Sequence, residues 1–516
     1  MKKVLLVNWD NYPNNATGGV YAWEKDLIDN ILNYEFVIVN LLSNPNANGN
    51  YTVPSHVTRV IDVPLFGCYR YEEFYKEKNQ ALFSKILRTN VSAVKQKFLP
   101  LYREFLNIVF SDNCDYEQFS QVIFKLHKLL LKYDGKKFIE NSYAWEAFIE
   151  RITKDYLYRN VTLREARFVF QIIQRIMQIL SIEVPKVDII HCSLAWFPAM
   201  IAVFASMESN CPVIITEHGV AFRDLSLYHS SYFYNGPSSI LWKFFSGNVI
   251  RLIYSIADVI APVCYANAKW EENLGADPSK INIIYNGIDT NRYRPMQIIK
   301  EDDDNTTANR PRVVYIGRVE VLKDVMNLIQ SIKYVKEQLP DIQCLIYGIS
   351  TDLDYSFQCI NLVKSLELNE NIKFMGSTKE PEKAYNAGDV IVLCSIAEGF
   401  PYTIIEAMAC KKAVVSTDVG GVREALEECG VLVRSRHPHD LANAIVKLLM
   451  DKRLRDELAA NSAKRITQMF TLEKSVNQYR KLYSDLIKSN EPDIPILRIY
   501  HDSKTPEEIL KKSGGV

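Results

Sequence analysis

Two glutamates, Glu398 and Glu406, stand eight positions apart in the stretch AEGFPYTIIEAMACKKAVVSTDVGG. Paired carboxyl groups about 5 to 9.5 Å apart are the acid and base of glycoside hydrolysis. Gly399 and Pro401 predict a loop at Glu398, whereas residues 403–410 are apolar enough for a buried helix. The stretch therefore places one carboxylate before a helix N-terminus and the other a turn inside the helix.

Backbone N–H groups at the start of that helix would lack intrahelical partners and carry partial positive charge, so they could bind anionic oxygens. A ligand with hydroxyls at both ends and phosphates in the middle fits this arrangement, and a nucleotide-sugar has that form. A solvated loop glutamate beside an unrelated helix glutamate would give the same spacing. The segment alone leaves both interpretations open.

A second candidate anion site follows the apolar run 313–316, which is typical of a buried strand. Gly317 lets the chain leave the sheet sharply, and we expect Arg318 and Lys323 to reach one anionic group. Arginine offers a planar fork and lysine a compact charge, so together they could hold a pyrophosphate and stabilise the charge that grows as it departs. The alternative is an ordinary exposed charge pair.

In the first half of the chain, Gly18 and Gly19 follow a strand-like run and open a predicted helix at 21–32. Adjacent glycines permit close backbone approach to a ligand, although a turn without a ligand is the alternative. The spacing is not G-x-G-x-x-G, so the dinucleotide fingerprint is missing. His218 follows the run 213–216 beside Gly219, and we expect it in a cleft.

Three other groups are interpreted as structural. His191 and Cys192 end another predicted strand with less support for a ligand role. The acidic clusters Asp302–Asp304 and Asp352 with Asp354 resemble metal-binding groups, but they lie in polar stretches and are predicted to be solvated loops. The sequence therefore predicts no metal site.

The elements that must position these residues are short apolar runs alternating with helical patterns, which predicts parallel sheets covered on both faces. Ligands of such doubly wound folds bind beyond the carboxyl ends of the strands. The expected strands are 4–7, 36–40, 189–191, 213–216, 259–262, 312–316, 343–347, 390–394 and 413–416.

The predicted organisation has two Rossmann-like α/β domains, 1–295 and 312–489, joined by a polar linker at 296–311. Residues 68–183 lack strand-like runs and carry helical periodicity, so they form a helical insertion in the first domain. A packing elaboration is favoured there over a lid that shapes the substrate site. Residues 490–516 form a polar tail.

Composition excludes several classes of function. The 61 Lys and Arg residues balance the 61 Asp and Glu residues, which leaves no electrostatic footprint for nucleic acid. Ten cysteines are scattered without C-x-x-C spacing, which favours the reducing cytosol. The apolar run at the N-terminus is too short for a signal-peptide core, and no run approaches the roughly 18 apolar residues of a membrane span.

Taken in order, these motifs resemble a known family. The chain is similar to the retaining glycosyltransferases of family 4, which have the GT-B fold of two Rossmann-like domains facing a cleft. The resemblance covers both domains and is strongest from about residue 285 to 483. The motifs that carry it are Tyr285-Asn-Gly-Ile-Asp289, Gly317-Arg318 with Lys323, Gly376, Ala387-Gly-Asp389 and Glu398-x7-Glu406.

Within this family the chain most resembles the PelF-like branch, which makes an exopolysaccharide from UDP-glucose. Gly18-Gly19-Val-Tyr-Ala-Trp23, Thr216-Glu-His-Gly219 and the long helical insertion carry this narrower match. The sequence departs from the branch pattern after Gly219, which leaves the acceptor, and in part the donor sugar, open.

The resemblance implies a role for each candidate residue. Glu406 would hydrogen-bond the ribose hydroxyls, and Glu398 and His218 would contact the donor sugar. Catalysis would depend on His218, Arg318, Lys323 and Glu398. The donor-binding set would be Gly18, Gly19, Gly317, Arg318, Lys323, Glu398, Gly399, Phe400, Pro401, Tyr402 and Glu406.

The resemblance also implies the partners. These are a nucleotide-sugar donor and a glycan acceptor, with peripheral association with a membrane polysaccharide synthase complex and a cytoplasmic location. It implies no cofactor and no metal, since Arg318 and Lys323 take the role of a divalent ion. Competing interpretations are a sugar-nucleotide epimerase of the same fold, a pyridoxal-phosphate phosphorylase, and a nucleotide-sugar-binding subunit that does not transfer.

Overall fold

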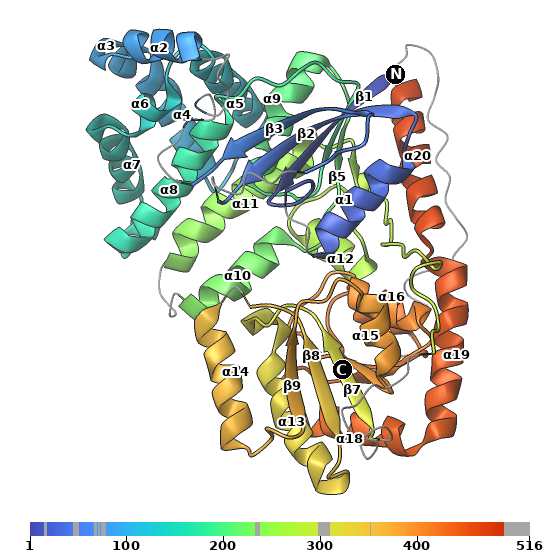
Figure 1. The fold of residues 1–516 in the computed structure, drawn as a ribbon. Helices are drawn as coiled ribbons and strands as arrows, with labels where there is room; N and C mark the ends of the chain where they lie inside the picture. The colour runs from blue at the N-terminus through green and yellow to red at the C-terminus, as the bar shows by residue number, and fades with distance from the viewer. Residues whose placement is uncertain are drawn as a thin grey trace.

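The fold is that of a computed structural model of the chain, which describes residues 1–14, 18–44, 51–66, 70, 73, 79–232, 238–297, 310–350 and 352–489. The predicted tail 490–516, most of the linker 296–311 and the cluster Asp302–Asp304 lie outside these residues. Figure 1 shows two α/β units, one above the other, with a group of helices beside the upper one.

The first sheet has six strands in the order β3-β2-β1-β4-β5-β6, and neighbouring strands pair in parallel. Its strands are β1 (Lys2–Trp9), β2 (Tyr34–Leu42), β3 (Val57–Pro64), β4 (Ile189–Cys192), β5 (Val213–Ile215) and β6 (Val259–Ile260). The helices outside the insertion are α1 (Gly19–Asn30), α9 (Met200–Ser209), α10 (Ala221–Tyr232), α11 (Ser238–Ile256) and α12 (Tyr265–Asn273).

The second sheet also has six parallel strands, in the order β12-β11-β10-β7-β8-β9. Its strands are β7 (Arg312–Ile316), β8 (Gln343–Tyr347), β9 (Ile372–Gly376), β10 (Val390–Leu393), β11 (Ala413–Thr417) and β12 (Val431–Val433). The later helices are α13 (Val325–Gln338), α14 (Leu353–Ser365), α15 (Pro381–Ala387), α16 (Tyr402–Ala409), α17 (Val422–Leu426), α18 (Pro438–Met450), α19 (Lys452–Met469) and α20 (Leu472–Ser489). Two doubly wound parallel sheets confirm the predicted fold class.

Every strand that the apolar runs predict is present, and three strands were missed. β3, β9 and β12 each lie at the edge of a sheet. An edge strand has one unpaired side and tolerates polar residues, as the exposed Arg59 of β3 and Lys373 of β9 illustrate. Polar residues therefore interrupt the apolar pattern of β3 and β9, whereas β12 is apolar but only three residues long.

The helical insertion is confirmed, and it shares one core with the first sheet. Side chains of the insertion such as Phe105, Phe148 and Ile173 belong to the same buried cluster as Leu5 and Val39 of the sheet. Its helices are α2 (Asn79–Arg88), α3 (Val91–Ala93), a π-helical turn (Val94–Phe98), α4 (Leu99–Val109), α5 (Tyr116–Leu130), α6 (Gly135–Ile139), α7 (Ser142–Lys154) and α8 (Leu163–Ile179). The shared core supports the packing interpretation of the insertion.

The last helix, α20, departs from the predicted domain boundary. It was grouped with the second domain, but its side chains Tyr479 and Tyr483 are buried with Leu6 and Phe36 of the first sheet. Figure 1 shows α20 beside the first strand, at the top of the molecule. The pattern of α20 indicates one buried face and carries no information about which sheet it covers.

The packing of α20 also explains why His191 is buried and hydrogen-bonded. Its Nδ1 lies 2.7 Å from the hydroxyl of Tyr483, and its Nε2 lies 2.8 Å from the hydroxyl of Thr216. Burial lowers the pKa of His191 to about 3, so the ring is neutral and structural.

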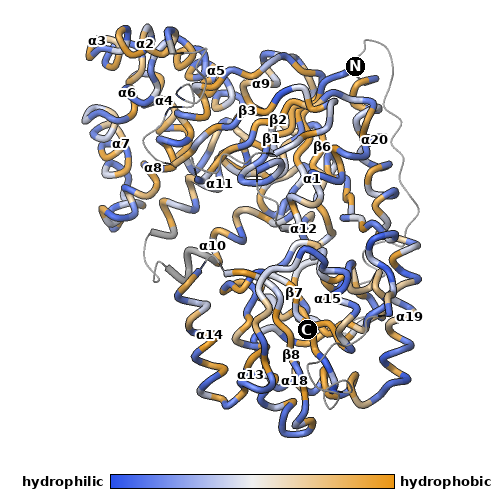
Figure 2. Tube along the Cα trace, viewed as in Figure 1, coloured by the Kyte–Doolittle hydropathy of each residue, from blue (hydrophilic) through white to orange (hydrophobic). Residues whose placement is uncertain are grey.

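Figure 2 shows the strands as mostly apolar, in keeping with their burial. Among the described residues, no helix has the length and apolar character needed to cross a membrane.

Candidate active site

The predicted site residues follow the carboxyl ends of strands near the middle of each sheet. Residues 317–323 follow β7, and Glu398 follows β10, its neighbour in the sheet. In the first sheet, Gly18 and Gly19 come after β1, and His218 follows β5. Carboxyl ends of parallel strands meet along one edge of a sheet, which is the usual location of ligands in such folds.

Lys323 and Glu398 form the central ion pair of the site. The ammonium of Lys323 lies 2.5 Å from Oε1 of Glu398, and the hydroxyl of Ser395 donates to the same oxygen at 2.6 Å. Glu398 is only 9% exposed. Both backbones are fixed, because the amide of Ile396 donates to the carbonyl of Leu322 at 2.8 Å. The pair links the loop after β7 to the loop after β10.

Arg318 and Lys323 do not contact the same partner in the structure. The exposed guanidinium of Arg318 lies 3.0 Å from Oε1 of Glu320, while Lys323 pairs with Glu398. The Arg318 backbone is held, since Tyr315 donates to its carbonyl at 2.7 Å. Gly317 donates its amide to the carbonyl of Tyr347 at 2.9 Å, which anchors the start of this loop.

Helix α16 begins at Tyr402, with Pro401 at its N-cap position and no side-chain cap. The loop before it is packed on two sides. A Cβ on Gly399 would lie 1.8 Å from the carbonyl oxygen of His218, and one on Gly420 would lie 1.9 Å from that of Glu398. Only glycine permits such close approach, so the sequence fixes the path of the backbone into the helix.

The N-terminus of α1 lies against the N-terminus of α16. Gly18 has φ of 101°, which favours glycine, and Gly19 opens α1. A Cβ on Gly19 would lie 2.9 Å from the ring of Tyr402. Each helix start carries partial positive charge, so the two create an electropositive region between the domains.

Glu406 lies on α16 and is held by tyrosines. The hydroxyl of Tyr385 donates to its Oε2 at 2.5 Å, and Tyr293 forms a second hydrogen bond. Burial raises the pKa of Glu406, and the two hydroxyls oppose that shift. Glu398 and Glu406 thus have separate partners. The two tyrosines were not predicted, because they lie far from Glu406 in the sequence.

His218 packs against Trp23 in the first domain. Its ring centroid lies 4.6 Å from that of Trp23, and its Nε2 is buried without a hydrogen-bond partner in the described structure. Burial lowers the pKa of His218 to about 3, so the ring is neutral near pH 7. A buried nitrogen without a partner is costly, and a ligand hydroxyl would satisfy it.

The neighbouring Glu217 anchors the loop that carries His218. The hydroxyl of Tyr254 donates to Glu217, and the amide of Ala221 donates to its Oε1 at 3.2 Å. Burial raises the pKa of Glu217. The sequence alone does not indicate that Glu217 has this anchoring role.

Glu424 of the second domain caps a helix of the first domain. Its carboxylate accepts from the amides of Tyr265 and Ala266, at 2.7 and 2.8 Å, at the start of α12. The hydroxyl of Tyr285 donates to it at 3.2 Å. Burial raises the pKa of Glu424, and these three donors oppose the shift. Sequence analysis did not single out Glu424, since its partners lie about 140 to 160 positions away.

The other residues predicted near the donor are structural in part. Phe400 is buried, and its carbonyl accepts from the side-chain amide of Asn286 at 2.9 Å.

The acidic cluster of Asp352 and Asp354 was predicted to lie in a solvated loop. Asp352 instead caps α14 by accepting from the amide of Tyr355, and Asp354 lies in the first turn of that helix. The described residues include no cluster of three or more metal-ligating side chains.

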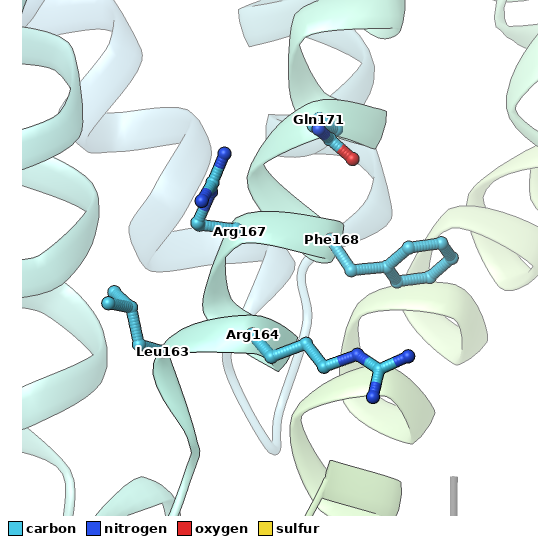
Figure 3. Close-up of a pocket in the computed structure, with 5 residues that line it drawn as sticks. All are labelled: Leu163, Arg164, Arg167, Phe168 and Gln171. Atoms are coloured by element: carbon cyan, nitrogen blue, oxygen red, sulfur yellow. The ribbon is translucent and has the colours of Figure 1, made fainter. Parts of the chain in front are cut away.

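A separate pocket of about 490 Å³ lies on the helical insertion, away from all the predicted site residues. Figure 3 shows Arg164 and Phe168 extending to the same side of α8. The lining residues all come from this helix: Leu163, Arg164, Arg167, Phe168 and Gln171.

Comparisons with known proteins agree with this geometry. Residues 298–465 match the model of glycosyl transferases group 1, and residues 2–279 match a domain of unknown function, DUF3492. The chain is similar to N-acetyl-alpha-D-glucosaminyl L-malate synthase of Bacillus anthracis, at 24% identity over 59% of this chain and 77% of that protein.

Two further proteins extend the comparison. N,N'-diacetylbacillosaminyl-diphospho-undecaprenol alpha-1,3-N-acetylgalactosaminyltransferase of Campylobacter jejuni is 28% identical over 50% of this chain and 69% of its own length. The crystal structure of Anabaena Alr3699/HepE in complex with UDP-glucose aligns with a TM-score of 0.59 at 16% identity, over 94% of this chain and all of that one. The second likeness shows a shared GT-B fold.

Proposed function

Because the chain belongs to the DUF3492 family over residues 2–279 and carries a group 1 glycosyltransferase domain, we propose that it is a retaining hexosyltransferase. It moves a hexose from a UDP-sugar, UDP-glucose or a close relative, to a glycan acceptor. The observation that carries the proposal is the meeting of the α1 and α16 N-termini beside the Lys323–Glu398 pair. A diphosphate between two sugars matches that distribution of charge.

Each part of the donor is assigned here to the residues whose chemistry suits it. The phosphates lie at the N-terminal amides of α16 and at Lys323, since both favour anionic oxygens. The ribose hydroxyls lie at Glu406 of the same helix. The choice of UDP-glucose is supported by the structure of the Anabaena protein, which shares the fold and holds UDP-glucose.

The donor sugar lies between Glu398 and His218. A donor hydroxyl satisfies the buried Nε2 of His218, and another replaces Lys323 as a partner of Glu398. Lys323 is then released to the diphosphate, where its charge stabilises the leaving group. Arg318 joins it by leaving Glu320.

The reaction itself needs positioning more than acid or base chemistry. The acceptor hydroxyl attacks the anomeric carbon from the face that the diphosphate leaves, and a departing phosphate oxygen receives its proton. The configuration is thereby retained. Charge on the leaving group is met by Lys323, Arg318 and the α16 amides, so we propose that turnover needs no metal ion and no cofactor.

The cellular role is inferred from the resemblance to the PelF-like branch. We propose a PelF-like role in exopolysaccharide synthesis in the cytoplasm, with association with a membrane synthase complex. The acceptor glycan is left open in this proposal, because the sequence departs from the branch after Gly219.

The test is a donor panel. Purified protein is incubated with radiolabelled UDP-, GDP- and ADP-sugars without acceptor, and release of labelled sugar is measured with and without excess chelator. We expect release from UDP-glucose or a related UDP-hexose, with less than a severalfold loss in chelator. Binding of UDP without release would indicate a binding subunit, and activity that vanishes with chelator and returns with manganese would contradict the charge assignment.

A further inference from the structure

The outer end of the helical insertion exposes apolar side chains on one short helix. Phe83 and Leu87 are 68% and 80% exposed and lie one turn apart on α2, so they share a face. Val91, at the start of α3, is 58% exposed. Figure 1 shows α2 and α3 at the corner of the molecule farthest from the second domain.

The segment that begins with α2 is basic. Residues 79–103 contain five Lys and Arg and no Asp or Glu. Of these, Arg88, Lys95 and Lys97 are exposed. Over 79–179 there are sixteen basic and ten acidic residues, although the whole chain is balanced at 61 of each. The insertion therefore concentrates positive charge on a neutral protein.

Exposed apolar residues alone do not distinguish this surface. On α14, Leu353 and Phe357 are 69% and 62% exposed with the same spacing. There, however, Asp352 and Asp354 stand beside the apolar pair. On α2 the exposed basic residues Arg88 and Lys95 follow the apolar pair instead, and an apolar pair with basic neighbours is typical of an interfacial helix.

We propose that the α2 surface, formed by Phe83, Leu87, Arg88, Val91 and Lys95, docks on an anionic lipid bilayer. Phe83 and Leu87 enter the boundary between headgroups and acyl chains, while Arg88 and Lys95 contact lipid phosphates. Each basic residue near such a membrane strengthens partitioning about fivefold. Docking of this kind is peripheral. It does not rest on the proposed transferase activity, because binding to vesicles needs no donor.

The experiment measures flotation of the full chain with phosphatidylcholine vesicles, with and without phosphatidylglycerol. We expect binding to the anionic vesicles only, and release at high salt. Phe83→Ser with Leu87→Ser should weaken binding at least about a hundredfold. Arg88→Gln with Lys95→Gln should weaken it by about 25-fold, from two charges at about fivefold each. The matched control is Leu353→Ser with Phe357→Ser on α14, which should bind as the wild type does.

Thermal unfolding and circular dichroism of each variant confirm that the fold is intact. Equal binding to neutral vesicles, no binding to anionic vesicles at low salt, or wild-type binding by either α2 variant overturns the proposal. Sedimentation velocity supplies a further test. A dimer that Phe83→Ser with Leu87→Ser abolishes would identify the surface as a contact between copies of the chain, which also overturns it.

Discussion

The ammonium of Lys323 pairs with Glu398, and the guanidinium of Arg318 pairs with Glu320. The two cations are thus balanced by separate carboxylates. Anionic ligands must displace these partners, so binding exchanges one set of charge pairs for another. Such exchange limits the gain in affinity from each cation and favours contacts that strengthen as charge grows on the leaving group.

Replacing Lys323 by alanine tests this interpretation. We expect kcat to fall about a hundredfold or more with little change in the Kd for UDP, because the contact is strongest in the transition state. Steady-state kinetics and titration calorimetry measure the two quantities. Lys336→Ala, which removes an exposed ammonium that contacts the carbonyl of Glu367, is the matched control. Equal losses of affinity and turnover would count against the assignment.

Glu406→Ala should instead affect donor binding. A carboxylate that holds ribose hydroxyls does so equally in the ground and transition states, so the donor KM rises while kcat changes little. Tyr385→Phe, which removes one donor to Glu406 and keeps its carboxylate, should show a smaller rise in KM. If kcat collapses at saturating donor in a folded Glu406 variant, the carboxylate acts in acid or base catalysis.

The sequence predicted where the candidate residues lie, but it did not predict which residues contact them. The positions of Glu398, His218 and Lys323 follow from apolar runs that end just before them, since such runs predict strands and ligands bind beyond strand ends. Their partners could not be predicted in this way. Tyr385 and Glu424 come from other elements, and only the folded chain brings them to Glu406 and to α12.

At the scale of elements, buried carboxyl groups hold a helix start in one place and a loop after a strand in another. Glu424 caps α12 across the domain boundary, and Glu24 of α1 accepts from Asn8 and from the amide of Tyr12 at 2.9 and 3.0 Å. The loops that carry the candidate residues are therefore anchored by buried carboxyl groups on both sides of the cleft.

Glu424→Ala should weaken the contact between the domains. The change leaves two amides of α12 without their carboxylate, which costs about 1 to 2 kcal/mol, so the midpoint of thermal unfolding falls by a few degrees. Calorimetry measures the shift. Glu428→Ala, an exposed position just beyond α17, is the control and should leave the midpoint unchanged. An unchanged midpoint for Glu424→Ala would mean that the cap contributes nothing to stability.

Glu24 should make the protein less stable as the pH rises. Burial raises its pKa from 4.5 to about 8, so the folded state holds a proton that the unfolded state has lost. The contribution is complete below pH 4.5 and is lost as the pH rises through about 8. Glu24→Gln cannot ionise, so its free energy of unfolding, measured by urea titration, should fall less across this range. A decline as steep as that of the wild type would refute the assignment.

The sequence predicted the buried elements of the fold better than the partly exposed ones. Central strands such as β1 and β10 contain a run of four consecutive buried apolar residues, and each was found. The strands β3 and β9 were not, because Arg59 and Lys373 interrupt their apolar pattern, and β12 was not, because it has only three residues. The helical periodicity of the insertion predicted its class, but its shared core with the first sheet depends on tertiary packing.

At the scale of the whole molecule, the two domains touch through backbone. The carbonyl of His218 lies where a Cβ of residue 399 would have to be, 1.8 Å away. This contact sets how closely the loop before α16 approaches the first domain. It also fixes the distance across which a donor must reach from Lys323 to His218.

Gly399→Ala should therefore push the domains apart while leaving each one folded. We expect a loss of activity of at least about a hundredfold, because small displacements of reacting groups have effects of that size. The radius of gyration in solution scattering should increase. Gly247→Ala, where a Cβ would meet only the Arg251 side chain at 3.4 Å, is the matched control. Wild-type kinetics and scattering for Gly399→Ala would show that the domains do not pack through this contact.

Helix α20 completes a core that begins at the other end of the chain. Tyr479 and Tyr483 are buried among residues of β1, β2 and α1, and Tyr483 bonds His191. A ribosome makes about 5 to 20 residues per second, and domains generally fold as they emerge. During synthesis this core, which α1 covers in part, therefore lacks the α20 side chains until residues 472–489 have been made. The first domain can complete its packing only after the chain of the second domain has been translated.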